Sequence, residues 1–215
     1  MIRNVVLDIG GVLVDYHTVS FYENRGYDPE LSKRLADATM YGPYWEQQDL
    51  GLMSSDWIFS KMKEAHPEFS AIIDQNLYDQ TGIVTRRAES KAWIEHLRQS
   101  GYRVLVLSNF SQNALDHCPD ALDFLSSDLG GSGNTGDPGV ITEGIISCMD
   151  HVIKPYPEIF ALLLVRYGLK GEETVFVDDT EKNLSSPRLY GIHPVLFESR
   201  EQVESAINAL NAALT

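Results

Sequence analysis

The chain has 215 residues, of which 43% are hydrophobic and 22% charged, and this balance indicates a folded globular protein rather than a disordered one. Its 31 acidic side chains outnumber 17 basic ones, and the resulting net charge of −14 argues against binding to nucleic acid or to an anionic membrane surface. Neither a bilayer-spanning apolar stretch nor a signal-peptide pattern is found, so we expect a cytoplasmic protein.

Five short apolar runs predict the strands of a parallel sheet. Four of them are Val5–Leu7, Val104–Leu107, Val175–Val177 and Val195–Phe197, and a weaker one lies at Ile145–Ile146. Because polar residues do not alternate with apolar ones inside these runs, helices are expected to cover both faces of each strand.

Helical patterns fall between the apolar runs. Ala88–Ser100 and Pro155–Tyr167 are each followed by a glycine, which is typical of a helix end. The last segment begins at Ser199 with a capping-box sequence and carries Val203 and Ile207 on one face. Strand and helix alternate from Arg86 to this last segment. The alternation predicts an α/β fold with a doubly wound parallel sheet.

Residues 16–84, the helical insert, interrupt this alternation. They contain helix-start signals at Asp28 and Ser54 but no apolar run typical of a strand. We predict that residues 16–84 form a small helical cap subdomain on a core made of residues 1–15 and 85–215. The large aromatic residues of the insert are interpreted mainly as its own core, with one or two facing a ligand. They include Tyr41, Tyr44, Trp45 and Trp57.

Two other features are given a structural interpretation. The glycine-rich segment 130–139 is taken as a surface insertion, because no strand precedes it and no Gly-Lys-Ser/Thr follows it. Cys118 and Cys148 are too few for a disulfide framework or a thiolate zinc site, and neither has a reactive setting in the sequence.

Polar side chains follow several of the predicted strands at the point where each strand ends. They are Asp8, Ser108, Asn109, Asp178 and Asp179, and Lys154 precedes a helix shortly after the weak strand at Ile145–Ile146. Parallel strands end at one edge of a sheet, and ligands bind beyond that edge, so we expect these side chains to converge. Each residue alone is also explained as a helix cap or a solvated charge. Only their expected convergence at one edge of the sheet indicates a functional site.

The chemistry of these groups points to a phosphoryl site. Carboxylates gathered in one place repel one another unless a cation lies between them, and Mg²⁺ prefers carboxylate and carbonyl oxygens. A hydroxyl, backbone amides and an ammonium group suit the outer oxygens of a phosphoryl group. A carboxylate beside the metal can attack phosphorus and form an aspartyl phosphate.

In this order the residues resemble the motifs of the haloacid dehalogenase superfamily of phosphohydrolases, over nearly the whole chain. Asp8–Asp15 is similar to the first motif, Leu107–Asn109 to the second, Lys154-Pro155 to the third, and Val177–Asp179 with Asn183 to the fourth. The helical insert resembles the small caps of the first subclass. Receiver domains also gather Asp, Ser/Thr and Lys at a sheet edge, but their acidic pair comes early in the chain and here it comes late.

The resemblance implies a nucleophile and a metal site. Asp8 would be the nucleophile and a Mg²⁺ ligand, and the Gly10 carbonyl and Asp179 would complete the protein's share of the metal shell. Asp178 would act directly on the metal or through a neighbouring group.

The resemblance also implies a phosphate site. Ser108, Asn109 and the amides of Gly10 and Gly11 would hold the phosphoryl oxygens, and Lys154 would neutralise the charge that develops. Catalysis of phosphoryl transfer depends mostly on positioning and electrostatics. Replacing Lys154 should therefore lower the activity nearly as much as replacing Asp8.

One position departs from the family pattern. The family usually has a second Asp, a general acid/base, two residues after the nucleophile, where this chain has Gly10. Proton transfer by such a group contributes about 10²–10⁴ in rate. Its absence disfavours a phosphomutase and favours a phosphatase whose substrate has a good leaving group. A branch with the same Asp-x-Gly pattern includes bacterial phosphatases of sugar 1-phosphates such as glucose 1-phosphate. Another residue or a metal-bound water is the alternative source of the proton.

These observations predict a Mg²⁺-dependent phosphatase that acts on a small phosphorylated metabolite, with a sugar phosphate as the favoured substrate. One alternative is a phosphoryl- or metal-binding protein that lost turnover together with the second Asp. A carbon–halogen hydrolase is a weaker alternative, because that chemistry needs no magnesium and leaves the acidic pair unexplained. His151 is interpreted as a loop residue, with a substitute acid/base as the alternative, and Asp15 as a hinge residue. No sequence feature predicts an oligomeric state.

Overall fold

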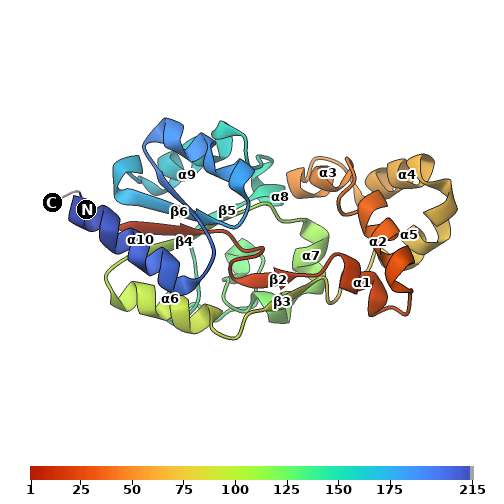
Figure 1. The fold of residues 1–215 in the computed structure, drawn as a ribbon, viewed down its shortest axis with the longest axis horizontal. Helices are drawn as coiled ribbons and strands as arrows, with labels where there is room; N and C mark the ends of the chain where they lie inside the picture. The colour runs from red at the N-terminus through yellow and green to blue at the C-terminus, as the bar shows by residue number, and fades with distance from the viewer. Residues whose placement is uncertain (214–215) are drawn as a thin grey trace.

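Five parallel strands form the central sheet of the protein, in the order β5-β4-β1-β6-β7 (Figure 1). The structure is a computed structural model and describes residues 1–213. The strands are β1 (Asn4–Leu7), β4 (Arg103–Ser108), β5 (Gly144–Ile146), β6 (Thr174–Asp178) and β7 (His193–Leu196). The predicted parallel sheet is thus confirmed, and each strand overlaps one of the five apolar runs.

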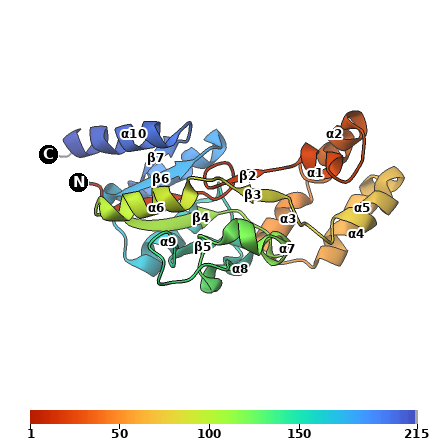
Figure 2. The ribbon, with the colours of Figure 1, turned by 90° about the horizontal axis from the view of Figure 1, so that it is seen from below.

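Helices cover both faces of this sheet (Figures 1 and 2). They are α6 (Ser90–Gln99) and α10 (Arg200–Ala213) on one face and α9 (Pro157–Tyr167) on the other. Successive strand residues point to opposite faces, so Val5 and Leu7 pack in the core with α6 and α10, while Val6 packs in a second core with α9. Both faces are buried, which is why the strands carry no polar alternation.

The sequence signals mark the ends of these helices closely. The predicted helices over 88–100 and 155–167 are observed as α6 and α9, each starting two residues later than predicted. At the start of α10, the Ser199 hydroxyl accepts a hydrogen bond from the Gln202 amide at 3.2 Å, which is the expected cap.

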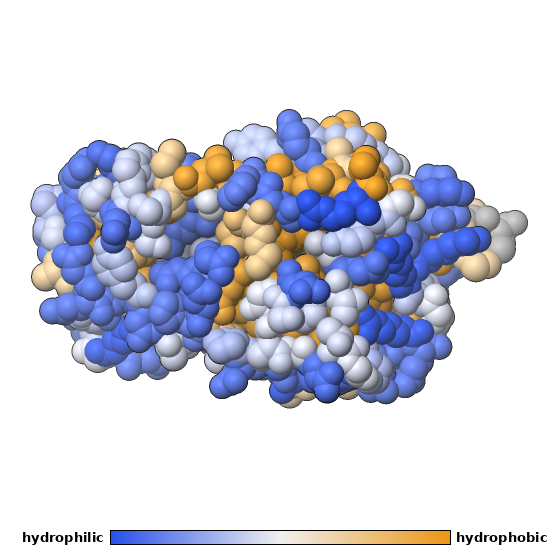
Figure 3. All heavy atoms as spheres, turned by 180° about the vertical axis from the view of Figure 1, so that it is seen from behind, coloured by the Kyte–Doolittle hydropathy of each residue, from blue (hydrophilic) through white to orange (hydrophobic). Residues whose placement is uncertain are grey.

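The helical insert forms the end of the molecule that lies opposite the two termini (Figure 1). Its helices are α1 (Val19–Glu23), α2 (Pro29–Ala38), α3 (Trp45–Leu50), α4 (Ser55–Ala65) and α5 (Ser70–Asn76). The Asp28 carboxylate caps α2 and the Ser54 hydroxyl caps α4, as the start signals predict. Seen from behind, this end is mostly hydrophilic, and apolar side chains gather near the middle of the face (Figure 3).

A two-stranded antiparallel sheet joins the insert to the rest of the chain (Figure 2). It consists of β2 (Val14–Tyr16) and β3 (Val84–Arg86), which no pattern in the sequence predicts. Each strand has only three residues, one of them buried, so neither contains a recognisable apolar run. Next to this sheet, the Arg87 guanidinium donates to the Asp15 carboxylate at 2.7 Å and ties the two connections together.

The remaining elements are short. They are α7 (Gln112–His117), α8 (Ser147–Asp150), η1 (Pro67–Phe69), η2 (Pro119–Leu122), η3 (Ser127–Leu129), η4 (Gly171–Glu173), η5 (Glu181–Leu184) and η6 (Ser186–Tyr190). Arg98 of α6 donates to the carbonyls of Pro138 and Val140, both at 2.7 Å, and so holds the glycine-rich segment against the core.

Among residues 1–213, none of the helices combines the length and the apolar character that crossing a membrane requires.

Both cysteines are buried and free of disulfide bonds. Burial, with the nearby charge of Asp49, raises the pKa of the Cys148 thiol to about 12. A thiol that stays protonated at neutral pH is a poor nucleophile, which fits the interpretation of Cys148 as inert.

Candidate active site

The register of the parallel strands brings the predicted site residues to one edge of the sheet. Leu7 of β1 pairs with Val177 of β6, so the next residues along these strands, Asp8 and Asp178, lie side by side. On the other side of β1, strand β4 ends at Ser108. The convergence expected from the sequence is therefore present in the fold.

Asp8 is 6% exposed, and one of its carboxylate oxygens is held by three donors. The Oδ1 atom accepts from the Ile9 amide at 2.7 Å, from the Ser108 hydroxyl at 2.7 Å and from the Lys154 ammonium at 2.8 Å. Within residues 1–213, no hydrogen bond reaches the other oxygen, Oδ2. Asp8 thus combines a fixed orientation with one oxygen free for a ligand.

Lys154 lies between two carboxylates and is itself only 2% exposed. Its Nζ is 2.8 Å from Asp8 Oδ1 and 2.7 Å from Asp178 Oδ2. Burial alone would lower the pKa of Lys154, but the charges of Asp8 and Asp178 outweigh burial and raise it above its ordinary value. The side chain is therefore a fixed ammonium group beside the Asp8 carboxylate.

Asp178 is fully buried and has both carboxylate oxygens engaged by the protein. Besides the Lys154 contact, it accepts from the Thr180 amide at 2.8 Å and from the Asn183 side chain, which is 3.0 Å from each oxygen. Asp179, the next residue, is exposed and accepts on Oδ1 from the Thr180 hydroxyl at 3.1 Å. The two neighbouring carboxylates thus have different surroundings.

The donor set fits a divalent ion. One carboxylate oxygen from each of Asp8, Asp178 and Asp179 lies within 4.8 Å of the others. Magnesium binds oxygens at about 2.1 Å, so oxygens on one ion lie up to about 4.2 Å apart and only small movements are needed. Burial, together with the charge of Asp178 and against that of Lys154, raises the pKa of Asp8 to about 7. Burial likewise raises the pKa of Asp179. Crowded carboxylates of this kind are stabilised by a cation.

The two glycines after Asp8 differ in their constraints. Gly11 has φ +69°, and a Cβ there would lie 1.9 Å from Asp179 Oδ2, so only glycine allows this close approach. At Gly10 the nearest atom to a built Cβ is Tyr16 Cδ2 at 3.9 Å. A side chain therefore has room at Gly10, and sterics do not explain the missing Asp of the family pattern.

Two of the groups predicted to hold the phosphate make other hydrogen bonds in the structure. The Gly11 amide donates to the Val14 carbonyl at 2.9 Å to close a turn, so it is not free for a phosphate. The Asn109 side chain donates to the Lys154 carbonyl at 3.0 Å and accepts from the Lys154 amide at 2.8 Å. The Asn109 side chain therefore holds the backbone of Lys154, and the role of Asn109 in phosphate binding stays a prediction.

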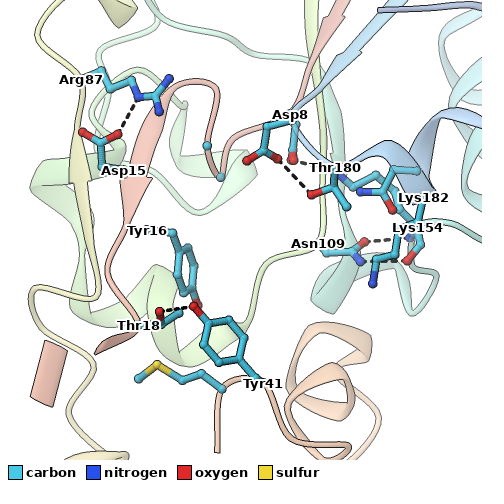
Figure 4. A pocket seen from close by; sticks show the side chains of 15 residues that line it. Asp8, Asp15, Tyr16, Thr18, Tyr41, Arg87, Asn109, Lys154, Thr180 and Lys182 are labelled. Atoms are coloured by element: carbon cyan, nitrogen blue, oxygen red, sulfur yellow. Dashed lines mark hydrogen bonds and ion pairs between the residues drawn. The ribbon is translucent and has the colours of Figure 1, made fainter. Parts of the chain in front are cut away.

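These groups open into a pocket of about 480 Å³ between the sheet edge and the helical insert (Figure 4). It is lined by Asp8, Gly10, Gly11, Asp15, Arg87, Asn109, Lys154, Asp179, Thr180, Lys182 and Asn183 of the core, and by Tyr16, Thr18, Met40 and Tyr41 of the insert. The hydroxyls of Thr18 and Tyr41 are 2.5 Å apart. Of the aromatic residues predicted to form mainly the insert's own core, Trp45 is buried, but Tyr41 and Trp57 are 64% and 41% exposed, so the prediction is wrong for these two. Tyr41 lines the pocket.

Several residues of this pocket lie outside the motifs that the sequence shows. Thr18, Met40, Arg87 and Lys182 carry no motif, and only their positions beside the predicted motifs or inside the aromatic-rich insert hinted at them. His151 does not line the pocket, because its ring nitrogen pairs with the Leu50 carbonyl at 3.0 Å. This contact argues against His151 as a substitute acid/base.

Comparison with known proteins identifies relatives. The sequence model of the family described as haloacid dehalogenase-like hydrolase matches residues 2–190. A mouse protein named "Acyl-CoA dehydrogenase family member 10" is 28% identical over 142 residues, which are 66% of this chain and 11% of that protein. The chain thus spans about a tenth of the length of this curated relative.

Solved structures share the fold. A HAD family enzyme from Bacteroides thetaiotaomicron, solved with magnesium and inorganic phosphate, has a TM-score of 0.68 and 20% identity and covers 92% of this chain and 95% of its own. A dehalogenase has a TM-score of 0.62 and 18% identity, over 91% of this chain and 84% of its own. At these identities the likeness shows the fold, and it includes both a phosphate-bound enzyme and a dehalogenase.

Proposed function

The chain belongs to the haloacid dehalogenase-like hydrolases, and from this premise we propose that it is a Mg²⁺-dependent phosphatase of small phosphorylated metabolites. The nucleophile would be Asp8, and the reaction would pass through an aspartyl phosphate. A sugar phosphate is the favoured substrate, in line with the resemblance to the Asp-x-Gly branch that acts on sugar 1-phosphates.

The carboxylate cluster carries this proposal. The oxygens of Asp8, Asp178 and Asp179 lie within 4.8 Å of one another, and Lys154 is the one ammonium group in contact with them among the described residues. Three carboxylates and one ammonium leave a surplus of negative charge, which a divalent cation offsets. Dehalogenation at carbon needs no such cation, so the cluster favours phosphoryl chemistry.

Each residue then has a defined task. We propose Asp8, Asp179 and the Gly10 carbonyl as metal ligands, whereas Asp178, with both oxygens engaged, anchors Lys154. Mg²⁺, when bound, supplies positive charge that offsets the approach of the anionic phosphate to a carboxylate. Ser108 and Lys154 already contact Asp8 Oδ1, so both lie beside the phosphorus that Asp8 attacks.

The helical insert would act as the cap of this enzyme. We propose residues 16–84 as a subclass I cap on a core of residues 1–15 and 85–215, with Tyr41 and Thr18 facing the leaving group. A cap that covers the pocket excludes bulk water and sets specificity. The two free, buried cysteines fit a reducing compartment, and we propose the cytoplasm.

The test is hydrolysis of 4-nitrophenyl phosphate by the full chain with Mg²⁺ and with a chelator. We expect turnover only with Mg²⁺ and its loss, by roughly 10⁴-fold or more, in Asp8→Asn. Asp120→Asn, which removes an exposed carboxylate outside the pocket, serves as the control and should keep full activity. Phosphate binding without turnover would support the non-catalytic alternative, and metal-independent halide release from a 2-haloacid would overturn the proposal.

The substrate is tested by a screen of phosphorylated metabolites. We expect the highest kcat/KM among sugar phosphates, because the pocket volume of about 480 Å³ suits a small polar molecule. A clear preference for a nucleotide or a phosphoprotein would contradict this part of the proposal while leaving the phosphatase reaction intact.

A further inference from the structure

The helical insert touches the core at a second place besides the two-stranded sheet β2–β3. In Figure 1 its helix α3 lies beside α8 of the core. The last carbonyl groups of a helix have no partner inside the helix and need donors from elsewhere. At the end of α3, the Ser147 hydroxyl donates to the Asp49 carbonyl at 2.6 Å. The His151 ring nitrogen Nδ1 contacts the Leu50 carbonyl at 3.0 Å. Core side chains at the two ends of α8 thus satisfy the end of α3.

The two backbones are also in direct contact at this place, which we call the α3–α8 junction. Gly51 follows α3 with φ +69°, and a Cβ there would lie 2.3 Å from the Cys148 carbonyl oxygen. Only glycine therefore allows this approach. His151, which follows α8, has φ +56°, a conformation that is uncommon for residues other than glycine. Left-handed backbone on both sides of the junction indicates that its geometry is closely defined.

Ser147 reaches further than the junction, because its hydroxyl also contacts the segment that follows strand β4. The side chain is fully buried, and its Oγ atom accepts a hydrogen bond from the Phe110 amide at 2.9 Å. The single hydroxyl proton goes to the Asp49 carbonyl at 2.6 Å, the nearer of two acceptors, since the Phe110 carbonyl lies at 3.4 Å. Hydrogen bonds in a chain strengthen one another, so donation to Asp49 makes Ser147 a better acceptor for Phe110.

The segment held in this way carries groups of the active site. Phe110 follows Ser108 and Asn109 in the chain. The Ser108 hydroxyl donates to the carboxylate proposed as the nucleophile at 2.7 Å, and the Asn109 side chain accepts from the Lys154 amide at 2.8 Å. On the other side of α8, His151 lies three residues before Lys154. Both core residues that receive the end of α3 are therefore connected to groups of the active site.

We propose that Ser147 is a positioning residue of the reaction, which couples the docking of α3 to the geometry of Ser108 and Lys154. This inference rests on the proposed phosphatase function. Ser147 does not line the pocket, so it acts through the Phe110 amide rather than on the substrate. When the insert is docked, the chain of hydrogen bonds from Phe110 to Asp49 is complete and holds the segment after β4. When α3 leaves the core, the hydroxyl loses its nearer acceptor and that segment loosens, so rapid phosphoryl transfer is confined to the covered pocket.

The first test disturbs the α3–α8 junction without changing any side chain that makes a hydrogen bond there. In Gly51→Ala the new methyl group meets the Cys148 carbonyl, so α3 must move away from α8. We expect hydrogen exchange at the Phe110 amide to become at least about tenfold faster, and by a larger factor than at the buried Val6 amide, which reports global unfolding. With Mg²⁺ and 4-nitrophenyl phosphate, kcat should fall roughly tenfold and KM should change less than about twofold, because Ser147 contacts no substrate.

Gly26→Ala is the matched control, because it carries the same kind of backbone cost without the contact. Gly26 also belongs to the insert and has φ +91°, but no atom lies within 4 Å of a Cβ built there. Hydrogen exchange at Phe110 and both kinetic constants should stay within about twofold of the wild type. Equal losses in Gly26→Ala and Gly51→Ala would overturn the proposal, because the effect would then come from backbone strain and not from docking.

A double-mutant cycle tests whether Ser147 carries the coupling. Ser147→Ala removes the hydroxyl and should lower kcat about 10- to 100-fold. Adding Gly51→Ala should then lower kcat by less than about twofold further, because the connection is already broken. Losses that multiply in the double variant, or an unchanged kcat in Gly51→Ala, would overturn the positioning role and leave the phosphatase proposal standing. Wild-type protein without Mg²⁺-dependent turnover of 4-nitrophenyl phosphate would overturn both.

Discussion

The sheet edge and the helical insert face each other across one pocket, yet they are built in different ways. On the sheet edge, Asp8, Lys154 and Asp178 are 6%, 2% and 0% exposed, and each makes at least two polar contacts. On the insert, Tyr41 is 64% exposed and its hydroxyl contacts Thr18 alone among the described residues. Buried charges are tolerated only in a fixed arrangement, whereas an exposed side chain can change freely. Chemistry is therefore expected to depend on the edge, and substrate choice on the insert.

Lys154→Met breaks the buried arrangement and should have the largest effect. It leaves the carboxylates of Asp8 and Asp178 without their shared cation, so we expect metal-free protein to lose roughly 3–5 kcal/mol of unfolding free energy. Activity should fall about 10³-fold, because the ammonium stabilises charge in the transition state. Denaturant unfolding and steady-state kinetics measure the two effects.

Lys182→Met is the matched control for that experiment. Lys182 lines the same pocket but is exposed, so its removal should change the unfolding free energy by no more than about 0.5 kcal/mol. Equal unfolding curves for wild type and Lys154→Met would show that the buried arrangement is not what distinguishes the edge from the insert.

Gly11→Ala is expected to have the next largest effect. A methyl group there would meet Asp179 Oδ2 at 1.9 Å in a backbone of φ +69°, so Asp179 must move away from Asp8. We expect the Mg²⁺ concentration for half-maximal activity to rise at least about tenfold, with a cost in stability of about 1–3 kcal/mol. Gly10→Ala, where the nearest atom is 3.9 Å away, should lose far less on both measures.

The core side of this comparison was largely predictable from the sequence. Near-continuous apolar runs such as Val5–Leu7 indicate strands covered on both faces, and in a parallel sheet their carboxyl ends must meet. The convergence of Asp8, Ser108 and the acidic pair follows from that topology, whereas Lys154 lies beyond α8 and reaches the site through the segment after that helix. Strands that are buried on both faces consist almost entirely of apolar residues, and this pattern is visible in a single sequence.

The short strands, the loop contacts and the contact between insert and core were not predictable to the same degree. Strands β2 and β3 have three residues each, too few for a periodic signal. The engagement of the Asn109 side chain with Lys154 and of the Gly11 amide with Val14 depends on loop geometry, which residue type does not determine. The hydrogen bond from the Ser147 hydroxyl to the Asp49 backbone carbonyl joins α8 to α3 across 98 positions of the chain, and no local pattern encodes it.

The pH dependence of stability follows from the buried carboxyl groups of both regions. The pKa values of Asp8 and Asp49 are raised from an ordinary 3.8 to about 7, chiefly by burial. Between these values the folded protein keeps protons that the unfolded chain has released, so the unfolding free energy falls as pH rises. We expect the Tm of metal-free protein to drop by several degrees between pH 5 and pH 8.

Magnesium should oppose this trend. By offsetting the charge of ionised Asp8, Mg²⁺ should raise the Tm more at pH 8 than at pH 5. Thermal scans at the two pH values, with the ion and with a chelator, measure the difference. A Tm of metal-free protein that rises steadily over this range would contradict the burial argument for both carboxyl groups.

Tyr41→Phe probes the insert alone and should have the smallest effect. It removes an exposed hydroxyl whose partner is Thr18, so the unfolding free energy should stay within about 0.5 kcal/mol and 4-nitrophenyl phosphate turnover within about twofold. The ratio of kcat/KM between two metabolites should still shift up to about tenfold, because one hydrogen bond to a leaving group discriminates on that scale. Trp57→Phe, at a 41% exposed residue outside the pocket, should leave the ratio unchanged. If both variants left every ratio unchanged, substrate choice would have to come from the sheet edge, and the division between the two regions would fail.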